Sequence, residues 1–248
     1  MSKPEEPQST NVTWFQVKPT KDNIRPETQR LLKTYSGIPL DQVFDHVVKV
    51  RNEAWEVHPY PCIGQFRFLE PSFTELEEFD EVVERLRKGQ KLLDMACCFG
   101  QTICQLVDGG APAENITSSD LQSDFIYKFL VADIFDSSSA LVDMRGSIDM
   151  GMKEQVIVSK AVAALLRPKP GSMILGCQIR AVKDTEKVGP TGTMYRHDVE
   201  SFKKMWREIG DDLGVTFTVD AKLKMLVGDH FLFHPDDTRR IWFVIRRE

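Results

Sequence analysis

Apolar positions along this chain follow helical spacing in some stretches and strand spacing in others, which predicts an α/β fold. A helical pattern is predicted over residues 26–57, interrupted by a turn at residues 35–40. Further helices are predicted over residues 76–86, 102–107, 154–166 and 199–209, the last with Phe202, Met205, Trp206 and Ile209 facing inward. Strands are predicted over residues 92–95, 116–119, 129–132, 172–178, 215–226 and 241–245. Because strands and helices alternate until the final pair, we expect a mostly parallel sheet with helices on both faces and an antiparallel last strand.

Turn and capping signals divide this pattern into three segments. Thr74 and Glu77 have the spacing of a capping box ahead of a helix that Gly89 ends. Before it, the stretch PYPCIGQFRFL is aromatic and rich in proline, so it cannot form one regular element. We therefore expect a flexible arm over residues 1–25, a helical and aromatic segment covering the active site over 26–70, and the catalytic core over 71–248.

The stretch KLLDMACCFGQ, residues 91–101, reads as a buried strand that runs into a tight turn and then a helix. The turn contains the small residues Ala96, Cys97, Cys98 and Gly100, so a ligand can come close to the backbone there. A helix N-terminus at the end of such a strand is where nucleotide-type cofactors bind. The turn is therefore the first candidate for a cofactor site.

Carboxylates stand at or near the C-terminal ends of three successive predicted strands, as Asp94, Asp120 and Asp133. In an open α/β sheet this edge is the ligand crevice. Asp120 lies twenty residues beyond Gly100, and a carboxylate at about that distance suits a ribose diol, since it accepts hydrogen bonds from both hydroxyls. The spacing strengthens the prediction of a nucleoside-containing cofactor.

Two cofactors fit this pattern. A dinucleotide site favours G-x-G-x-x-G, and this turn has a single glycine. Asp94 followed by A-C-C-F-G instead resembles, in degenerate form, the D-x-G-x-G-x-G motif of class I S-adenosylmethionine-dependent methyltransferases. The residues predicted to bind the cofactor are Asp94, Ala96, Cys97, Gly100, Asp120, Leu121, Ala132, Asp133 and Ile134. The alternatives are an NAD(P)-dependent reductase and an ordinary α/β domain with acidic loop ends.

Composition narrows the partners and the cellular location to be expected. The 248 residues carry a net charge of −5, which argues against a nucleic-acid groove. No apolar run approaches the roughly 20 residues of a membrane helix, and the polar N-terminus does not resemble a secretory signal. The five cysteines are an odd number and lack metal-ligand spacing. We expect a cytoplasmic protein without a metal, a membrane span or a nucleic-acid partner.

Two connections are short for the predicted topology. Only the eight residues LQSDFIYK separate Asp120 from Phe129, whereas a parallel crossover needs about a dozen or more. Met150 is followed at once by Gly151 and the next predicted helix. We expect that residues of the parent protein are absent after about Ile126 and after Met150. An evolutionary deletion at both places is the alternative.

Longer segments resemble the fungal meroterpenoid (polyketide–terpene) O-methyltransferases. The resemblance runs from about Asn23 to Glu248 and is carried by YSGIPLDQVFDHVVKVRNEAWEVHPYPCIGQFRFL, LLDMACCFGQ, ADIFD, LLRPKPGSMILG and YRHDVESFKKMW. It implies a class I methyltransferase (Rossmann-like) core, S-adenosyl-L-methionine as cofactor with S-adenosyl-L-homocysteine as product, and O-methylation. It further implies a farnesylated polyketide carboxylate as the acceptor, which would become a methyl ester.

Acceptor contacts are predicted in two places. Tyr195, Arg196 and His197 lie in the expected loop after strand 172–178, on the crevice side, and would position the acceptor; a solvated loop is the alternative. His58, Tyr60 and Arg67 of the covering segment and Gln178 at a strand end would bind substrate; core aromatics are the alternative for the first group. A carboxylate needs alignment but no general base, whereas a phenol would need one, most often histidine.

These observations predict an S-adenosylmethionine-dependent methyltransferase of fungal secondary metabolism that acts on a small lipophilic acid or phenol. A homodimer is the assembly to test. Two alternatives remain open at this point: a nicotinamide-dependent reductase, and a binding or scaffold subunit with a methyltransferase-like fold. The Tyr-x-x-x-Lys pair of many such reductases is absent from the sequence, which disfavours the first.

Overall fold

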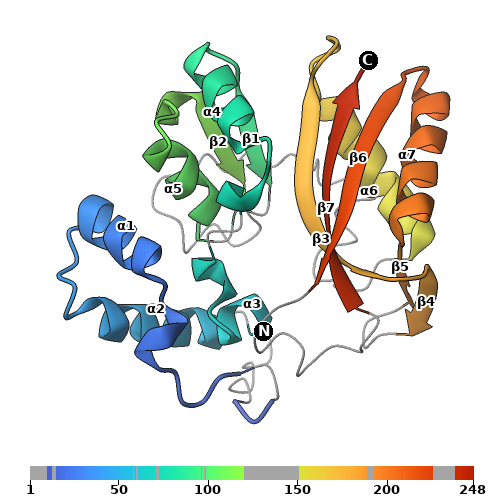
Figure 1. Ribbon diagram of the computed structural model, residues 1–248. Helices are drawn as coiled ribbons and strands as arrows, with labels where there is room; N and C mark the ends of the chain where they lie inside the picture. The colour runs from blue at the N-terminus through green and yellow to red at the C-terminus, as the bar shows by residue number, and fades with distance from the viewer. Residues whose placement is uncertain are drawn as a thin grey trace, which may run out of the picture. The chain divides into compact units, whose positions relative to one another are not determined.

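The computed structural model describes residues 10–12, 15–57, 59, 61–70, 73–95, 97, 99–119, 151–188, 193–225 and 238–248. The chain divides into two compact units, Met1–Asp133 and Ile134–Glu248 (Figure 1). Each unit contains both helices and strands, so the predicted α/β composition is confirmed.

The first unit begins with the two predicted helices, α1 (Pro26–Ser36) and α2 (Val43–Val57). Pro26 opens α1, where the fixed φ of proline suits the first turn. Gly37 ends α1 with a φ of 66°, a left-handed conformation that glycine adopts without steric cost. Short helical turns flank the pair: η1 (Lys21–Asn23), α3 (Pro61–Gly64) and η2 (Arg67–Leu69).

Residues ahead of α1 pack against these helices. Ile24 is buried with Val43 and Val47 of α2. The Phe15 ring lies 4.7 Å from the Trp55 ring, centroid to centroid. The amide side chains of Gln16 and Asn23 exchange hydrogen bonds of 2.9 and 3.2 Å. The described part of the expected arm is thus held on the surface of α2.

The rest of the first unit alternates helices and strands, with one local difference from the prediction. Its elements are η3 (Phe73–Glu75), α4 (Phe79–Arg87), β1 (Leu92–Met95), α5 (Gln101–Asp108), η4 (Ala113–Asn115) and β2 (Ile116–Ser119). The predicted capping box at Thr74 is wrong, because α4 begins only at Phe79. The Gln105 side chain accepts hydrogen bonds from the N–H groups of Phe73 and Thr74, so those groups need no helical cap.

Strand β1 pairs in parallel with β2, and Asp94 stands opposite Ser118. The expectation that β1 is buried on both faces is wrong for Leu93, whose side chain is 37% exposed. Among the described strands, β2 is the one partner of β1, so this small sheet leaves part of the strand at its surface.

The second unit is built on a three-stranded sheet. Its elements are α6 (Met152–Leu165), β3 (Met173–Ala181), β4 (Thr185–Val188), β5 (Thr193–Arg196), α7 (Val199–Leu213), β6 (Phe217–Met225) and β7 (Thr238–Arg247). The sheet order is β3-β7-β6, and β7 is antiparallel to both neighbours. The antiparallel last strand is therefore confirmed. The described strands form three separate sheets, and parallel pairing among them is confined to β1 and β2.

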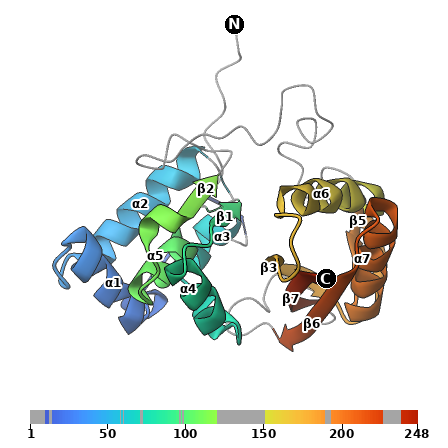
Figure 2. The same cartoon turned by 90° about the horizontal axis from the view of Figure 1, so that it is seen from above.

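Helices α6 and α7 cover one face of this sheet, as Figure 2 shows from above. The four residues predicted to face inward from α7 are all buried: Phe202, Met205, Trp206 and Ile209. They pack against Ile241, Phe243 and Ile245, which alternate along β7. The apolar run over residues 172–178 predicts a buried strand, but Cys177 and Gln178 at the end of that run are exposed.

Helix α7 begins with a capping box. The Asp198 carboxylate accepts a 2.7 Å hydrogen bond from the Ser201 N–H, and the Ser201 hydroxyl accepts a 3.0 Å bond from the Asp198 N–H. The hydrogen bond from Ser201 N–H is the main cause of a lowered pKa at Asp198. Because the folded pKa is depressed, this contribution to stability is present above the ordinary carboxyl pKa and is lost as pH falls through the folded one.

Asp198→Ala should therefore lower the free energy of unfolding by about 1 kcal/mol at pH 7. Asp198→Asn should cost much less, since an amide oxygen also caps a helix. Urea unfolding followed by circular dichroism measures both, and the difference between wild type and Asp198→Ala should shrink below about pH 4. Equal losses in the two variants would mean that the cap bond is not the source.

Candidate functional site

The predicted strand–turn–helix around the first motif is confirmed. Strand β1 ends at Met95, the buried Cys97 follows, and α5 begins at Gln101. The Gly100 N–H donates a 2.8 Å hydrogen bond to the Cys97 carbonyl, which closes the turn. Gly100 caps α5 with a φ of 74°, so the single glycine of the motif stands where a side chain would cause strain.

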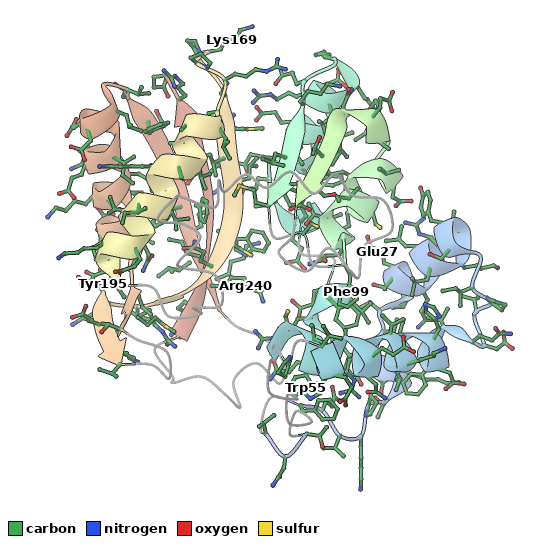
Figure 3. All side chains as sticks on the ribbon, turned by 180° about the vertical axis from the view of Figure 1, so that it is seen from behind. Glu27, Trp55, Phe99, Lys169, Tyr195 and Arg240 are labelled. Atoms are coloured by element: carbon green, nitrogen blue, oxygen red, sulfur yellow. The ribbon has the colours of Figure 1, made fainter. Side chains whose placement is uncertain are left out.

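Phe99 fixes this turn to the N-terminal segment. Its ring lies 4.6 Å from the ring of Phe68, centroid to centroid. It also packs against the cluster formed by Ala54, Trp55 and Ile63 (Figure 3). The N-terminal helices therefore support the turn directly through one aromatic side chain. The sequence analysis missed this role, because only the small residues of the turn were weighed.

Two buried polar atoms lie close to the turn in sequence and structure. Within the described residues, the Ser118 hydroxyl and the Gln101 side-chain carbonyl have no hydrogen-bond partner although both are buried. Ser118 stands opposite Asp94 across the β1–β2 pair, and Gln101 is the first residue of α5. Buried polar groups are nearly always paired, so these atoms suit a ligand that carries N–H or O–H groups.

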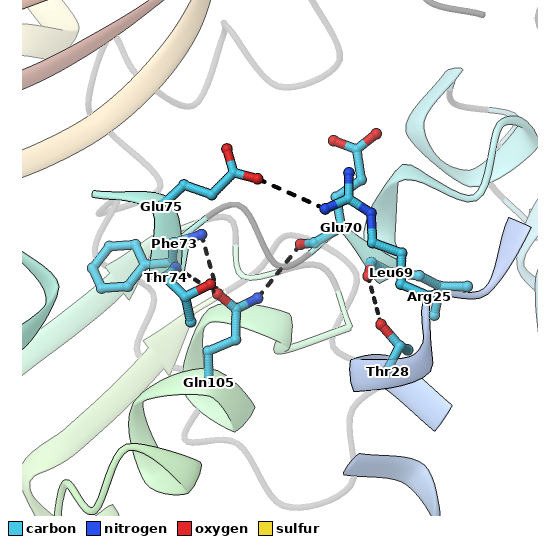
Figure 4. Close-up of polar contacts among 8 residues, drawn as sticks. All are labelled: Arg25, Thr28, Leu69, Glu70, Phe73, Thr74, Glu75 and Gln105. Atoms are coloured by element: carbon cyan, nitrogen blue, oxygen red, sulfur yellow. Dashed lines mark hydrogen bonds and ion pairs between the residues drawn. The ribbon is translucent and has the colours of Figure 1, made fainter. Parts of the chain in front are cut away.

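Gln105 joins α5 to the segment that follows η2, as Figure 4 shows. Its side-chain oxygen accepts hydrogen bonds of 3.1 Å from the N–H groups of both Phe73 and Thr74. Its amide nitrogen donates to the Glu70 carbonyl at 3.4 Å. The Thr28 hydroxyl donates to the Leu69 carbonyl at 3.0 Å, which ties α1 to the same segment. These contacts set the spacing between the N-terminal helices and α5.

Tyr195 and Arg196 lie in strand β5, which pairs with β4 as an antiparallel hairpin. The expected loop at these residues is therefore wrong. The Tyr195 hydroxyl donates a 2.6 Å hydrogen bond to the Asp184 carboxylate. Burial first, and then the hydrogen bond to Asp184, raise the pKa of Tyr195 to about 12. The phenol thus stays protonated at neutral pH and can donate a proton in a hydrogen bond.

His197 is fully buried, which the sequence analysis did not predict. Its ring packs edge-on against Tyr195 at 4.9 Å and Phe202 at 5.9 Å, and its Nδ1 lies 3.1 Å from the Ser201 hydroxyl. His197 precedes the N-cap of α7 and meets the fourth residue of that helix, the arrangement of a hydrophobic staple. The spacing H-D-V-E-S-F is the signal that could have revealed it. This burial does not support a direct contact with the acceptor.

The remaining predicted residues belong to separate elements or lie outside the described residues. Arg67 is half-buried in η2, and Gln178 is exposed on β3 opposite Ile241. The following predicted positions lie outside the described residues: His58, Tyr60, Ala96, Asp120, Leu121, Ala132, Asp133 and Ile134. Of the positions predicted to bind the cofactor, Asp94, Cys97 and Gly100 are thus the ones within the described residues, and they lie together at the turn.

Neither a metal centre nor a membrane-spanning helix is found among the described residues. Among the described positions, no group of three or more His, Cys, Asp or Glu side chains is placed to hold a metal ion. In the same part of the chain, no helix has the length and apolar character needed to cross a membrane.

Comparisons with known proteins identify close relatives. Residues 14–69 match the family described as "Meroterpenoid methyltransferase N-terminal domain". The chain is 34% identical to O-methyltransferase atr3 of Stereocaulon alpinum, over 95% of this chain and 76% of that protein. It is 32% identical to O-methyltransferase phiE of a fungal species, over 96% of this chain and 93% of phiE. It is 34% identical to methyltransferase ausD of Penicillium brasilianum, over 77% of this chain and 78% of ausD. The alignment with phiE spans 280 positions, so phiE has residues that this chain lacks.

Proposed function

This chain belongs to the fungal meroterpenoid methyltransferase family, and on that premise we propose that it transfers a methyl group from S-adenosylmethionine to an oxygen of a small lipophilic acid. The proposed acceptor is the carboxylate of a farnesylated polyketide intermediate, and the products are a methyl ester and S-adenosylhomocysteine. A phenol is the second acceptor to test.

The strand–turn–helix at Asp94 is the observation that carries this proposal. It has a carboxylate in β1, a tight turn capped by Gly100, and the buried oxygens of Ser118 and Gln101 without partners among the described residues. Such a site fits a ligand with ammonium and hydroxyl groups. The strand order β3-β7-β6, with β7 antiparallel between two strands that run parallel to each other, agrees with a class I methyltransferase core.

Proposed roles follow from side-chain chemistry. Asp120 would accept hydrogen bonds from the two ribose hydroxyls, and Asp94 would stabilise the turn and the ammonium group of the cofactor. Because they are small, Ala96, Cys97 and Gly100 would let the cofactor come close to the backbone of the turn. Leu121 and the residues Ala132, Asp133 and Ile134 would contact the adenine.

Methyl transfer requires the protein mainly to align the acceptor oxygen with the methyl group. When bound, S-adenosylmethionine would supply a methyl group on a positively charged sulfur. The acceptor oxygen would attack the methyl carbon in line, and the sulfur would leave as a neutral thioether. A carboxylate is already ionised at neutral pH, so the chain's residues need only hold it. Arg196 could pair with it, whereas the one proton of the Tyr195 hydroxyl is already donated to Asp184. Substrate contacts from His58, Tyr60, Arg67 and Gln178 stay predictions.

The rate should therefore be nearly constant between about pH 6 and pH 8 for a carboxylate acceptor. Arg196→Ala should raise the acceptor KM by about tenfold through lost alignment, with the affinity for S-adenosylmethionine nearly unchanged. Arg207→Ala, at an exposed position of α7, is the matched control and should change neither value. A pH–rate profile and initial rates at varied acceptor concentration measure these effects.

A rate that rises through a histidine-like pKa would instead indicate a phenol acceptor and a general base. An unchanged KM in Arg196→Ala would move the acceptor site to Arg67 and the other predicted residues of the covering segment.

Two other functions remain distinguishable by direct binding. A nicotinamide-dependent reductase would bind NADPH, and a non-catalytic subunit would turn over neither cofactor. Titration calorimetry with S-adenosylmethionine and NADPH should show binding of the first alone. Binding of NADPH alone would contradict the proposal.

A further inference from the structure

A groove of about 240 Å³ lies within the first unit, between the N-terminal helices and α5. Its walls are mainly apolar and include Leu31 and Leu32 of α1, Val47 and Val50 of α2, Phe68 of η2, and Phe99 of the turn. Among the described residues that line it, none is Lys, Arg, Asp or Glu. Most of its wall therefore comes from the family's own N-terminal domain, residues 14–69.

Polar contacts beside the groove fix α5 to α1 and to residues 70–74. On one side, the Arg30 guanidinium and the Tyr35 hydroxyl donate hydrogen bonds of 2.9 and 3.1 Å to the Asp108 carboxylate at the end of α5. On the other side, the Gln105 side chain fixes α5 to residues 70–74. Helix α5 is thus held by charged and amide groups beside the apolar lining of the groove.

The groove also has a polar group where it meets the turn. Gln101, the first residue of α5, contributes to the lining, and its side-chain carbonyl is buried without a hydrogen-bond partner among the described residues. A site that combines an apolar body with a few placed polar groups is typical of small-molecule binding.

We propose that this groove binds the isoprenoid arm of the acceptor. This inference rests on the proposed function, because it assigns part of that substrate to a surface. The described lining is branched aliphatic and aromatic and contains no Lys, Arg, Asp or Glu, so it suits a hydrocarbon rather than a cofactor that carries charge.

The volume of the groove agrees with an isoprenoid chain as its occupant. A cavity of about 150 Å³ with apolar walls binds benzene, so a groove of about 240 Å³ accommodates a somewhat longer hydrocarbon segment. A partner helix, with a diameter of about 10 Å, would need far more room.

The test compares two ligands by calorimetry: a farnesylated dihydroxybenzoic acid and the same acid without the farnesyl chain. Cys104→Phe fills the groove from its exposed rim, and Leu31→Gln places a polar group on its wall. Each should weaken binding of the farnesylated acid by about tenfold, because the variant displaces or opposes buried methylenes. Affinities for the short acid and for S-adenosylmethionine should not change.

Thr34→Phe is the matched control, since it adds the same ring at an exposed position of α1 that does not line the groove. It should leave both affinities unchanged. Full-strength binding of the farnesylated acid to Cys104→Phe and Leu31→Gln, or an equal loss for both acids, would overturn the proposal. A change of oligomeric state in Cys104→Phe, read by sedimentation, would overturn it in favour of a second copy of the chain as occupant.

Failure of the proposed function has a different signature. If wild type does not bind S-adenosylmethionine, that function is wrong. A selective loss of the farnesylated acid in Cys104→Phe would still support the groove as its binding surface.

Discussion

Arg51→Ala is expected to lower the free energy of unfolding of the first unit by about 3 kcal/mol. Arg51 is 2% exposed. Its guanidinium carbon lies 4.2 Å from the ring centre of Phe15 and 4.6 Å from that of Phe66. Its Nη1 donates to the carbonyls of Gln16 at 3.0 Å and Gly64 at 3.4 Å. One side chain thus links α2 to the segments on both sides of it.

Truncation of Arg51 to alanine removes several of these contacts together. It empties the space between two aromatic rings, which costs packing and a cation–π contact. It also removes a donor from two backbone carbonyls. Burial lowers the pKa of Arg51, so part of the gain is offset by the cost of burying its charge, and the expected loss is smaller than the sum of its contacts.

Hydrogen exchange of the α2 amides measures this loss within the first unit. Lys49→Ala, on an exposed position of the same helix, is the control and should stay within about 0.5 kcal/mol of wild type. Arg51→Lys should recover only part of the loss, because an ammonium cannot stack flat between two rings. If Arg51→Ala matched Lys49→Ala, the central role of this guanidinium would be wrong.

The second large effect concerns the cofactor. Asp120→Ala should weaken S-adenosylmethionine binding by about 1–3 kcal/mol, since two ribose hydroxyls would lose a charged acceptor. Asp94→Ala should weaken it as well, through the turn and the ammonium group. Asp45→Ala, at an exposed position of α2, should have no effect. Titration calorimetry with each purified variant gives the dissociation constants.

Unchanged affinity in both Asp94→Ala and Asp120→Ala would remove the cofactor assignment. A loss confined to Asp94→Ala would keep the turn as the site and move the ribose contact to another residue.

Local periodicity predicted the helices of this chain well. Apolar residues at helical spacing placed α1, α2 and α7, and all four inward residues predicted for α7 are buried. These elements follow from neighbours in sequence, which a single chain displays directly. The turn before α5 was predictable for the same reason, because small residues and Gly100 stand together.

Contacts between distant segments were not predictable in this way. Gln105 reaches back to Phe73 and Thr74, and so a 3-10 turn forms where a capping box was expected. The sequence does not reveal the role of Phe99, because its partner Phe68 lies 31 positions earlier. It does not reveal strand β5 either, since the hairpin partner of that strand, β4, carries little apolar patterning.

One measurement tests the central claim most directly. The protein is incubated with S-adenosylmethionine that carries a deuterated methyl group and with the farnesylated dihydroxybenzoic acid, and the product is fragmented in a mass spectrometer. The account predicts one deuterated methyl group, located on the carboxyl oxygen as an ester, with S-adenosylhomocysteine formed in equal amount. The absence of a deuterated product, while an NADPH-dependent change of the same acid occurs, would contradict it.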